Sequence, residues 1–275
     1  MKNQEQWIPE STPLDKPNAA RMYDYFLGGY HNLEVDRLAT AKSLEIYPDT
    51  KIGIQSSRAF LRRAVRFMCA QGIDQFLDIG SGIPTVGNVH EVAQEANPST
   101  RIVYVDIDPV AIGHSRAMLV DNPLAVAIQA DARDSDHILN HADVRRLIDF
   151  TKPVGVLFLC LLHFINDFAE AHGVVRAFRE SVATGSYIAI SHAISDALPR
   201  DVVERLQAIY AGTTNPGGFR TGAEVEQFFE GLEVVEPGLV LAPLWRPEGP
   251  DDIALNEPER TASLVGVGRV VAEER

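Results

Sequence analysis

The chain has 275 residues, of which 45% are hydrophobic and 23% are charged, a composition that excludes a disordered chain. Its length suits one α/β domain with an N-terminal extension. The formal net charge of −13 repels phosphate backbones and anionic lipid, so we expect no nucleic acid and no membrane among its partners.

Residues 1–20 are polar and contain three prolines, which predicts a loosely held tail. They include no apolar stretch that could direct export, and the longest apolar run, at 154–162, is about half of a membrane span. We therefore expect a cytoplasmic protein. The cysteines, Cys69 and Cys160, stand in apolar runs and are expected to be buried thiols. No sequence feature predicts an oligomeric state.

Residues 21–32 read RMYDYFLGGYHN and bring four large rings and two glycines together before any predicted strand. Such rings need a surface to cover. We interpret residues 21–72 as an N-terminal helical cap, whose first part forms a lid over a bound ligand. In this interpretation Tyr23 faces a cofactor, whereas Tyr30 and His31 face a substrate.

The alternative is that the rings of Tyr23, Phe26 and Tyr30, which share one helical face, only staple a helix to the flank of a sheet. The two interpretations differ in what deletion of residues 1–32 should do. A lid predicts a folded protein with weak cofactor binding, and a staple predicts general instability.

From Ser57 the apolar residues recur at helical spacing, with Ser56 or Ser57 available as the cap. Gly72 is well suited to end this helix. One face carries three arginines at four-residue spacing: Arg58, Arg62 and Arg66. We interpret this basic stripe as a solvated helix face.

Residues 73–275 alternate short branched apolar runs with amphipathic segments, which is typical of βαβ units and a doubly wound, mostly parallel α/β sheet. The predicted parallel strands are 76–79, 102–105, 125–129, 154–160 and 187–190. The predicted helices between them are 88–96, 109–119, 137–150 and 169–182. A capping box at Thr221 and Glu224 predicts another helix. Later apolar runs predict further strands at 232–235, 239–241 and 263–271.

The first strand ends in FLDIGSGIPTVGN, which places Asp78, Gly80 and Gly82 at a strand-to-helix turn. In open α/β sheets, ligands bind at the carboxyl ends of the strands, and glycines let a ligand approach the backbone. Asp106 follows Gly80 by 26 residues at the end of the second strand, and Asp131 ends the third. This spacing predicts a nucleotide-like ligand whose ribose bonds to a carboxylate.

A dinucleotide would require a third glycine, yet Thr85 stands three positions after Gly82, and the carboxylate of Asp78 would repel a pyrophosphate. A ligand with a positive charge and no phosphate suits the loop better. S-adenosyl-L-methionine, which carries a sulfonium, is such a molecule.

Six motifs together resemble a bacterial family of S-adenosyl-L-methionine-dependent methyltransferases, long regarded as uncharacterised, from about residue 18 to residue 270. They are RMYDYFLGGYHN, SRAFLRRAVRFM, QFLDIGSGIPTVGNVHEVAQ, RIVYVDIDPV, QADARD and LHF followed later by SYIAISH. The resemblance implies a class I Rossmann-like fold with a seven-stranded sheet. It further implies that the methionine end of the cofactor is held by Asp78, Gly80, Ser81 and Gly82. Asp106 would bind the ribose, Ile107 would pack on the adenine, and Asp131 with the amide of Ala132 would read its amino edge. Pro84 departs from the general methyltransferase pattern, which has a glycine there.

The fourth predicted strand is followed by Leu161-Leu162-His163-Phe164 in place of an Asn-Pro-Pro-Tyr motif. Methyl transfer depends mainly on alignment of donor and acceptor, so this absence does not exclude activity. If a general base exists, His163 is the first candidate and His192 the second. The alternative for both is a histidine that is only hydrogen-bonded at a strand end. The histidines lack metal-ligand spacing, so we expect no metal.

The favoured function is a methyltransferase that acts on an oxygen or nitrogen atom of a small molecule. A second hypothesis is a sensor or accessory protein that binds S-adenosyl-L-methionine without transferring its methyl group. A nicotinamide-dependent oxidoreductase ranks third, because of the charge and glycine arguments above.

Overall fold

The computed structural model describes residues 12–85 and 87–272, so the first eleven residues of the predicted tail lie outside the described part. The helices of this part are α1 (Ala19–Phe26), α2 (Glu34–Ile46), α3 (Thr50–Ala70), α4 (Val89–Ala96), α5 (Pro109–Met118), α6 (Ser135–Asn140), α7 (Ala142–Leu147), α8 (Phe168–Ser181), α9 (Arg200–Ala211) and α10 (Gly222–Gln227). Its strands are β1 (Gln75–Ile79), β2 (Arg101–Asp106), β3 (Ala125–Gln129), β4 (Gly155–Leu159), β5 (Tyr187–Ala193), β6 (Leu232–Val234), β7 (Val240–Leu241) and β8 (Ser263–Val270). One 3₁₀ turn, η1 (Leu162–Phe164), follows β4.

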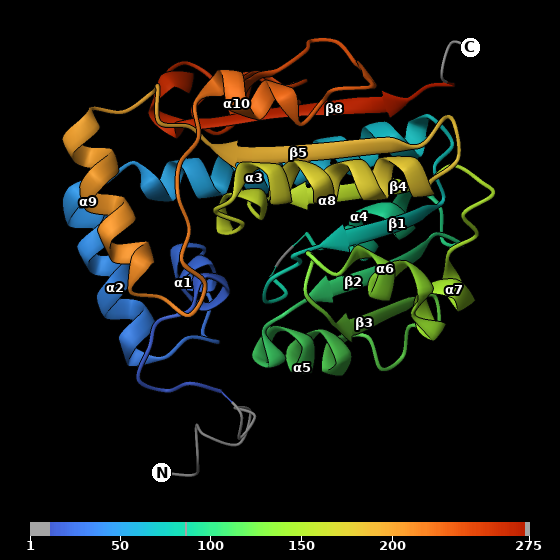
Figure 1. The fold of residues 1–275 in the computed structure, drawn as a ribbon, viewed down its shortest axis with the longest axis horizontal. Helices are drawn as coiled ribbons and strands as arrows, with labels where there is room; N and C mark the ends of the chain where they lie inside the picture. Colours follow the sequence, from blue (N-terminus) through green and yellow to red (C-terminus); the bar gives the residue numbers. More distant parts are fainter. Residues whose placement is uncertain (1–11, 86, 273–275) are drawn as a thin grey trace.

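The strands form one mixed sheet in the order β3-β2-β1-β4-β5-β8-β6, with β7 paired to β8 (Figure 1). The first five are parallel, and β8 runs antiparallel to β5. The predicted mostly parallel α/β sheet is therefore confirmed. The resemblance implied seven strands, whereas the described residues contain eight; the two-residue strand β7 lies within the run predicted at 239–241. The strand order reverses between β1 and β4, which is the switch point where ligands bind in such sheets.

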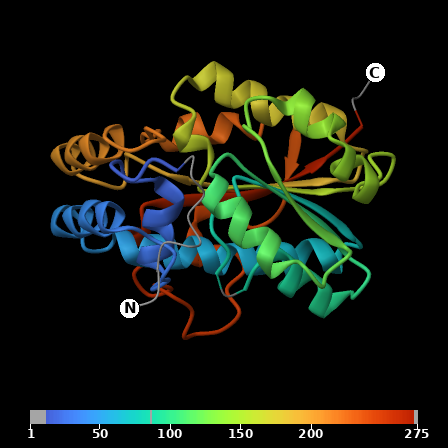
Figure 2. The same ribbon diagram turned by 90° about the horizontal axis from the view of Figure 1, so that it is seen from below.

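Helices cover both faces of the sheet, as Figure 2 shows with the strands seen nearly edge-on. One core joins the sheet to α6, α7, α8 and α10, and includes the edge-to-face pair of Phe158 and Phe178. The other joins the opposite face to α3, α4 and α5 and includes Phe60 packed on Trp245. Helix α3 thus belongs to the α/β layers, although the sequence placed it in the cap.

Helix α3 begins at Thr50, so the predicted start and cap at Ser56 or Ser57 were wrong. Both serines are buried inside the helix. The added turns pack closely on the chain before β8, where a Cβ on Gly53 would lie 2.5 Å from the carbonyl oxygen of Thr261. A glycine at this contact interrupts the apolar pattern, which is why the periodicity showed only the later half of the helix.

The predicted helix at 137–150 is two short helices, α6 and α7. His141 separates them in an extended conformation, and its Nδ1 accepts a hydrogen bond from the amide of Asp143 at 3.2 Å. The other predicted crossover helices are confirmed as α4, α5 and α8.

Helices α1, α2 and α9 lie together beyond the carboxyl ends of the parallel strands (Figure 1). Met22 and Phe26 of α1 pack in a small separate cluster with Ala39 of α2 and with Ile209 and Tyr210 of α9. Helix α2 has no predicted counterpart, because its buried residues are small or polar and give no apolar stripe: Asp36, Ala39, Thr40 and Ser43.

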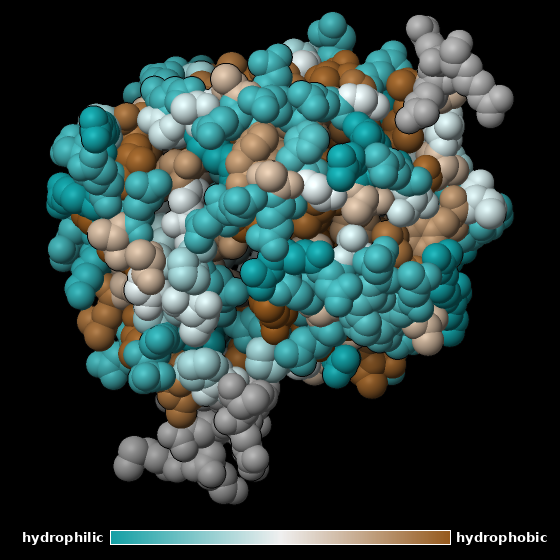
Figure 3. Space-filling model, viewed as in Figure 1, coloured by the Kyte–Doolittle hydropathy of each residue, from teal (hydrophilic) through white to brown (hydrophobic). Residues whose placement is uncertain are grey.

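The face seen in Figure 3 is mainly hydrophilic, with hydrophobic side chains in separate small groups. Within residues 12–85 and 87–272, no helix combines the length and the apolar character that crossing a membrane requires.

Candidate active site

A cavity of about 230 Å³ lies at the carboxyl ends of β1, β2 and β4, under α1, α3 and α9. Its lining is mostly apolar and comes from parts of the chain as distant as residues 18 and 263. One half contains the glycine loop after β1 and the acidic end of β2. The other half is walled by α3, α9 and the segments 215–219 and 261–263.

The glycine loop is held against the end of β2 by backbone bonds. Gly80 and Ser81 donate to the carbonyl of Val105 at 2.8 and 3.0 Å, and the amide of Gly82 donates to Oδ2 of Asp106 at 2.7 Å. Gly80 has a φ of +73°, a conformation that favours glycine, and a Cβ there would lie 2.6 Å from the side chain of Leu161. The sequence therefore folds into a turn that fixes the Asp106 carboxylate at the loop.

Two carboxylates of this half are buried. Burial raises the pKa of Asp78 to about 7, while the positive charge of Arg58 acts in the opposite direction. Burial also raises the pKa of Asp106 to about 6, against hydrogen bonds from the amides of Asp108 and Gly82. Both raised pKa values show that negative charge is costly here, so a cationic ligand would be favoured.

The structure brings most of the predicted site residues together. The cavity lining contains Tyr23, Asp78, Gly80, Ser81, Gly82, Asp106, Ile107 and His163. The side chain of Ile107 is 43% exposed, an apolar surface at the acidic end of β2. The individual roles assigned to these residues stay predictions.

Four predicted residues are not among those that line the cavity: Tyr30, His31, Asp131 and Ala132. Tyr30 is 90% exposed and stands two residues after Gly28, whose φ is +83°. The centroid of the His31 ring lies 3.9 Å from that of the His114 ring on α5. Asp131 is paired with Arg133 at 2.5 Å, and both side chains are partly exposed.

Several lining residues were not predicted for the site. Arg58, assigned to a solvated stripe, lines the cavity and donates to Asn88 Oδ1 at 2.8 Å. Of that stripe, Arg66 fits the solvated interpretation and pairs with Glu248 at the surface. Cys160, expected to be a buried thiol, and Tyr210 also line the cavity. Cys160 has a φ of +52°, which is uncommon for a residue with a side chain.

His192 is fully occupied as a structural residue. Its Nε2 lies 2.9 Å from Nη1 of Arg220, which can only donate, so Nε2 is the acceptor and Nδ1 carries the proton. Nδ1 then donates to the carbonyl of Ala193 at 2.7 Å. No nitrogen remains to act as a base. By contrast, Nδ1 of His163 is buried and has no hydrogen-bond partner among the described residues.

Arg220 also fixes the turn that carries His163. Its guanidinium donates to the carbonyls of Leu162, at 2.7 Å, and Ile165. It lies over the rings of Phe168 and Phe228. Among residues 12–85 and 87–272, no group of three or more side chains is arranged to hold a metal ion.

Replacing Arg220 with methionine should destabilise the protein, because it leaves buried carbonyls without donors. We expect the free energy of unfolding to fall by about 3 kcal/mol, measured by urea denaturation. Arg205→Met, on the exposed side of α9, is the matched control and should change stability by less than about 0.5 kcal/mol. Equal effects of the two substitutions would contradict a stabilising role for the hydrogen bonds of Arg220.

Comparisons with known proteins agree with this geometry. The chain matches the model of the S-adenosyl methyltransferase family over residues 5–271. A candidate methyltransferase from Thermobifida fusca YX is 42% identical with a TM-score of 0.88, and the match covers 94% of this chain and 97% of that one. A DUF574 family protein from Streptomyces avermitilis MA-4680 is 36% identical with a TM-score of 0.87, covering 94% and 98%.

No match is found among curated proteins. The family match extends over nearly the whole chain, and both solved structures share the fold from end to end, so the predicted family resemblance is confirmed. The chain belongs to the S-adenosyl methyltransferase family and is a methyltransferase whose methyl donor is S-adenosyl-L-methionine.

Proposed function

We propose that the protein methylates an oxygen or nitrogen atom of a small molecule bound in the same cavity as the cofactor. The observation that carries this proposal is the shape of the cavity. The glycine loop and the carboxylates form one part of the lining, and the rest, from α1, α3, α9 and the segments 215–219 and 261–263, is mostly apolar.

The residues of the first half fit S-adenosyl-L-methionine. Ser81 Oγ is buried with no hydrogen-bond partner among the described residues, so it is left to bond to a ligand. Each oxygen of Asp106 accepts one backbone amide, from Gly82 or Asp108, and can accept a second bond from a ribose hydroxyl. Bound here, the cofactor supplies a methyl group on a sulfonium.

Within this proposal the methionine end lies between Asp78 and Arg58. Asp78 would pair with the amino group and Arg58 with the carboxylate. Ile107 would pack on the adenine, and Tyr23 would cover the cofactor from α1. Asp131 and the amide of Ala132 would hydrogen-bond to the amino edge of the adenine. For this, the Asp131 carboxylate must break its ion pair with Arg133.

A small acceptor suits the site better than a macromolecule. The net charge of −13 disfavours nucleic acid. Phe26, Tyr210 and Phe219 reach the cavity from separate segments and enclose a compact space. The alternative, a sensor that only binds the cofactor, would need no apolar half beside the glycine loop.

The buried Asp78 makes cofactor affinity depend on pH. Its raised pKa of about 7 means that a proton must leave before the carboxylate can pair with a cation. Since the cation lowers this pKa on binding, affinity should rise between about pH 6 and pH 8 and then level off. Calorimetric titration should show this rise for wild type and a flatter, weaker profile for Asp78→Asn. Identical profiles would exclude Asp78 from the binding site.

His163 remains the candidate base. Burial keeps its pKa well below the usual value, so the ring is neutral at physiological pH and can accept a proton. Such a low pKa also makes the ring a weak base. We therefore expect His163→Asn to slow methyl transfer at saturating cofactor by about 10²-fold, which is the lower limit of the rate effects typical of a positioned general base. An unchanged rate would reduce His163 to a structural residue.

The proposed function is tested by incubating the protein with methyl-labelled S-adenosyl-L-methionine and a cell extract. The mixture is then separated by ultrafiltration into small molecules and retained macromolecules. We expect label in the small-molecule fraction, and less of it with Asp106→Ala. Label only in the retained protein or nucleic acid fraction would overturn the proposal. The absence of transfer with intact cofactor binding would favour the sensor.

A further inference from the structure

Residues 213–219, called here the α9–α10 segment, form one wall of the mostly apolar part of the cavity. Its sequence TTNPGGF contains no charged residue, and only its first three side chains can form hydrogen bonds. The cavity lining includes four of its residues: Asn215, Gly217, Gly218 and Phe219. The polar contacts of the segment decide which of its groups are left to bind a ligand.

Backbone hydrogen bonds hold the segment at both ends. The amide of Thr214 donates to the carbonyl of Pro17, just before α1, at 2.9 Å. The amide of Gly218 donates to the carbonyl of His163 in η1 at 2.8 Å. Between these two bonds, Pro216 restricts its own backbone and that of the residue before it. The segment is therefore a fixed wall between α1 and η1.

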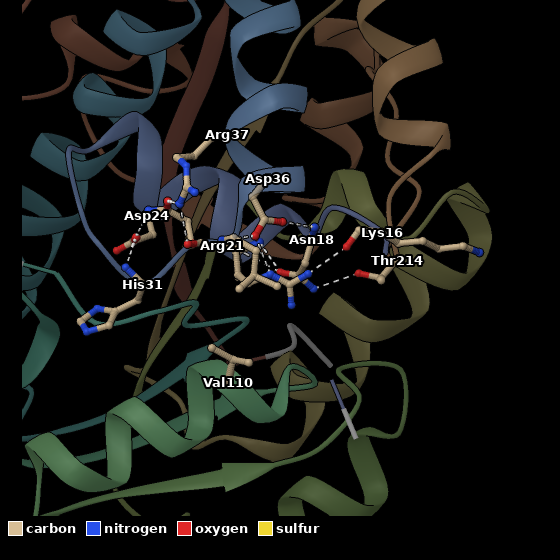
Figure 4. Close-up of polar contacts among 12 residues, drawn as sticks. Lys16, Asn18, Arg21, Asp24, His31, Asp36, Arg37, Val110 and Thr214 are labelled. Atoms are coloured by element: carbon tan, nitrogen blue, oxygen red, sulfur yellow. Dashed lines mark hydrogen bonds and ion pairs between the residues drawn. The ribbon is translucent and has the colours of Figure 1, made fainter. Parts of the chain in front are cut away.

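Helix α1 sets the orientation of the Asn18 amide. As the N-cap of this helix, Asn18 accepts at Oδ1 from the backbone amides of Ala20 and Arg21, at 2.8 and 3.3 Å. The other atom of the amide is therefore Nδ2, which can only donate. It donates to Oγ1 of Thr214, as Figure 4 shows, and to Oδ1 of Asn215, both at 3.0 Å.

The bond from Asn18 in turn fixes the Asn215 amide. The atom that receives an N–H must be an oxygen, so Oδ1 of Asn215 faces Asn18 and Nδ2 is the other atom. Oδ1 also accepts from the hydroxyl of Thr214 at 2.9 Å. The hydroxyl of Thr213 lies 2.7 and 2.8 Å from the carbonyl oxygens of Tyr210 and Asn215. Among the residues that the structure describes, none accepts a hydrogen bond from Nδ2 of Asn215.

Nδ2 of Asn215 thus carries the side-chain N–H groups of this wall that remain for a ligand. Both lone pairs of Oδ1 are already used, so a ligand N–H at this place would meet a second donor. A ligand oxygen with free lone pairs, such as that of a carbonyl group, would instead complete the amide.

We infer that Nδ2 of Asn215 donates a hydrogen bond to an oxygen atom of the methyl acceptor, and that Asn215 determines specificity for acceptors with a carbonyl or similar oxygen on an apolar body. The inference rests on the proposed function and deepens it. The polar groups of the cofactor are assigned to the glycine loop and to the ends of β1, β2 and β3. Asn215 belongs to the mostly apolar part of the lining, where the acceptor is expected.

Asn215→Asp tests this inference, because it replaces only the N–H groups and keeps an oxygen for the bonds from Asn18 and Thr214. The full chain is saturated with S-adenosylhomocysteine, and calorimetry measures its affinity for 2-acetylnaphthalene and for 2-ethylnaphthalene. These probes have nearly the same shape and differ by one carbonyl oxygen. The ratio of the ketone affinity to the hydrocarbon affinity should fall at least about fivefold in the variant, the effect of one hydrogen bond. Comparing ratios cancels the different hydration of the two probes.

Asn166→Asp is the matched control. Asn166 is exposed, and its Nδ2 donates to the carbonyl of Pro216 at 3.3 Å, so the substitution adds the same charge beside the same segment but outside the cavity lining. It should keep the wild-type ratio. An unchanged ratio in Asn215→Asp, an equal fall in both variants, or a loss of affinity for S-adenosylhomocysteine in Asn215→Asp would overturn the inference.

The extract experiment gives a second readout that does not depend on the probes. Asn215→Asp should put at least about fivefold less label into the small-molecule fraction than wild type, whereas Asn166→Asp should match wild type. Equal labelling by wild type and Asn215→Asp would overturn the inference and leave the proposed function intact. Failure of the proposed function would instead appear as wild-type label in macromolecules.

Discussion

Asp106→Ala is expected to weaken S-adenosyl-L-methionine binding by at least about 100-fold. The substitution removes two functions at once. The carboxylate holds the amides of Gly82 and Asp108 at 2.7 and 2.8 Å, and in the proposed complex it also binds the ribose. Hydrogen bonds to charged groups contribute about 1.5–3 kcal/mol each, and each 1.4 kcal/mol changes affinity tenfold. Calorimetric titration with the cofactor measures the loss.

Asp106→Asn should lose nearly as much, because an amide nitrogen cannot accept from a backbone N–H. Asp136→Ala provides the control: this exposed residue of α6 lies outside the cavity lining and should bind the cofactor like wild type. Circular dichroism should show that all three variants are folded. Near-normal affinity in a folded Asp106→Ala protein would remove the carboxylate from the cofactor site.

The cofactor half of the site could be predicted from sequence because it depends on local rules. Parallel strands end at one edge of the sheet, so residues at the carboxyl ends of β1 and β2 must be neighbours. Asp78 and Asp106 follow this rule and share the cavity. Asp131 follows β3 by two residues at the same edge, but the rule places only its backbone. Arg133, two residues later, pairs with the side chain, and Asp131 is not among the residues that line the cavity.

The other half could not be predicted, because no local pattern describes it. Its walls join α3 to the segment 261–263 and α1 to α9, pairs separated by about two hundred residues in the sequence. In isolation, Phe164 and Tyr210 resemble ordinary core residues. Cys160 likewise lies in an apolar run, and only the folded chain shows that its positive φ turns it toward the cavity.

Whether the N-terminal rings form a lid or a staple depends on the polar contacts that hold α1 (Figure 4). Arg21 is buried, and its Nε lies 2.8 Å from Oδ2 of Asp36, which is also buried. Oδ1 of Asp36 accepts from the amide of Asn18 at 2.8 Å, and the Asn18 side chain donates to Thr214 after α9. These contacts join α1, α2 and the loop after α9 into one unit.

The same arginine connects this unit to the cofactor loop. Nη1 of Arg21 lies 3.8 Å from Oδ2 of Asp108, and the amide of Asp108 is one of the two that bind Asp106. Tyr23 and Phe26, on the same helix, line the cavity. The helix therefore has the contacts of a staple and those of a lid, so the deletion of residues 1–32 should lower both stability and cofactor affinity.

Arg21→Ala tests this coupling without removing the rings. It leaves the Asp36 carboxylate buried without its cation, so the free energy of unfolding should fall by about 3–5 kcal/mol. Arg200→Ala, which breaks an exposed pair with Glu204, should cost less than about 1 kcal/mol. Cofactor affinity, measured where Arg21→Ala is still folded, should also fall, because Asp108 loses the charge that orients it. A loss of stability with normal affinity would make α1 a staple only, and the reverse result would make it a lid only.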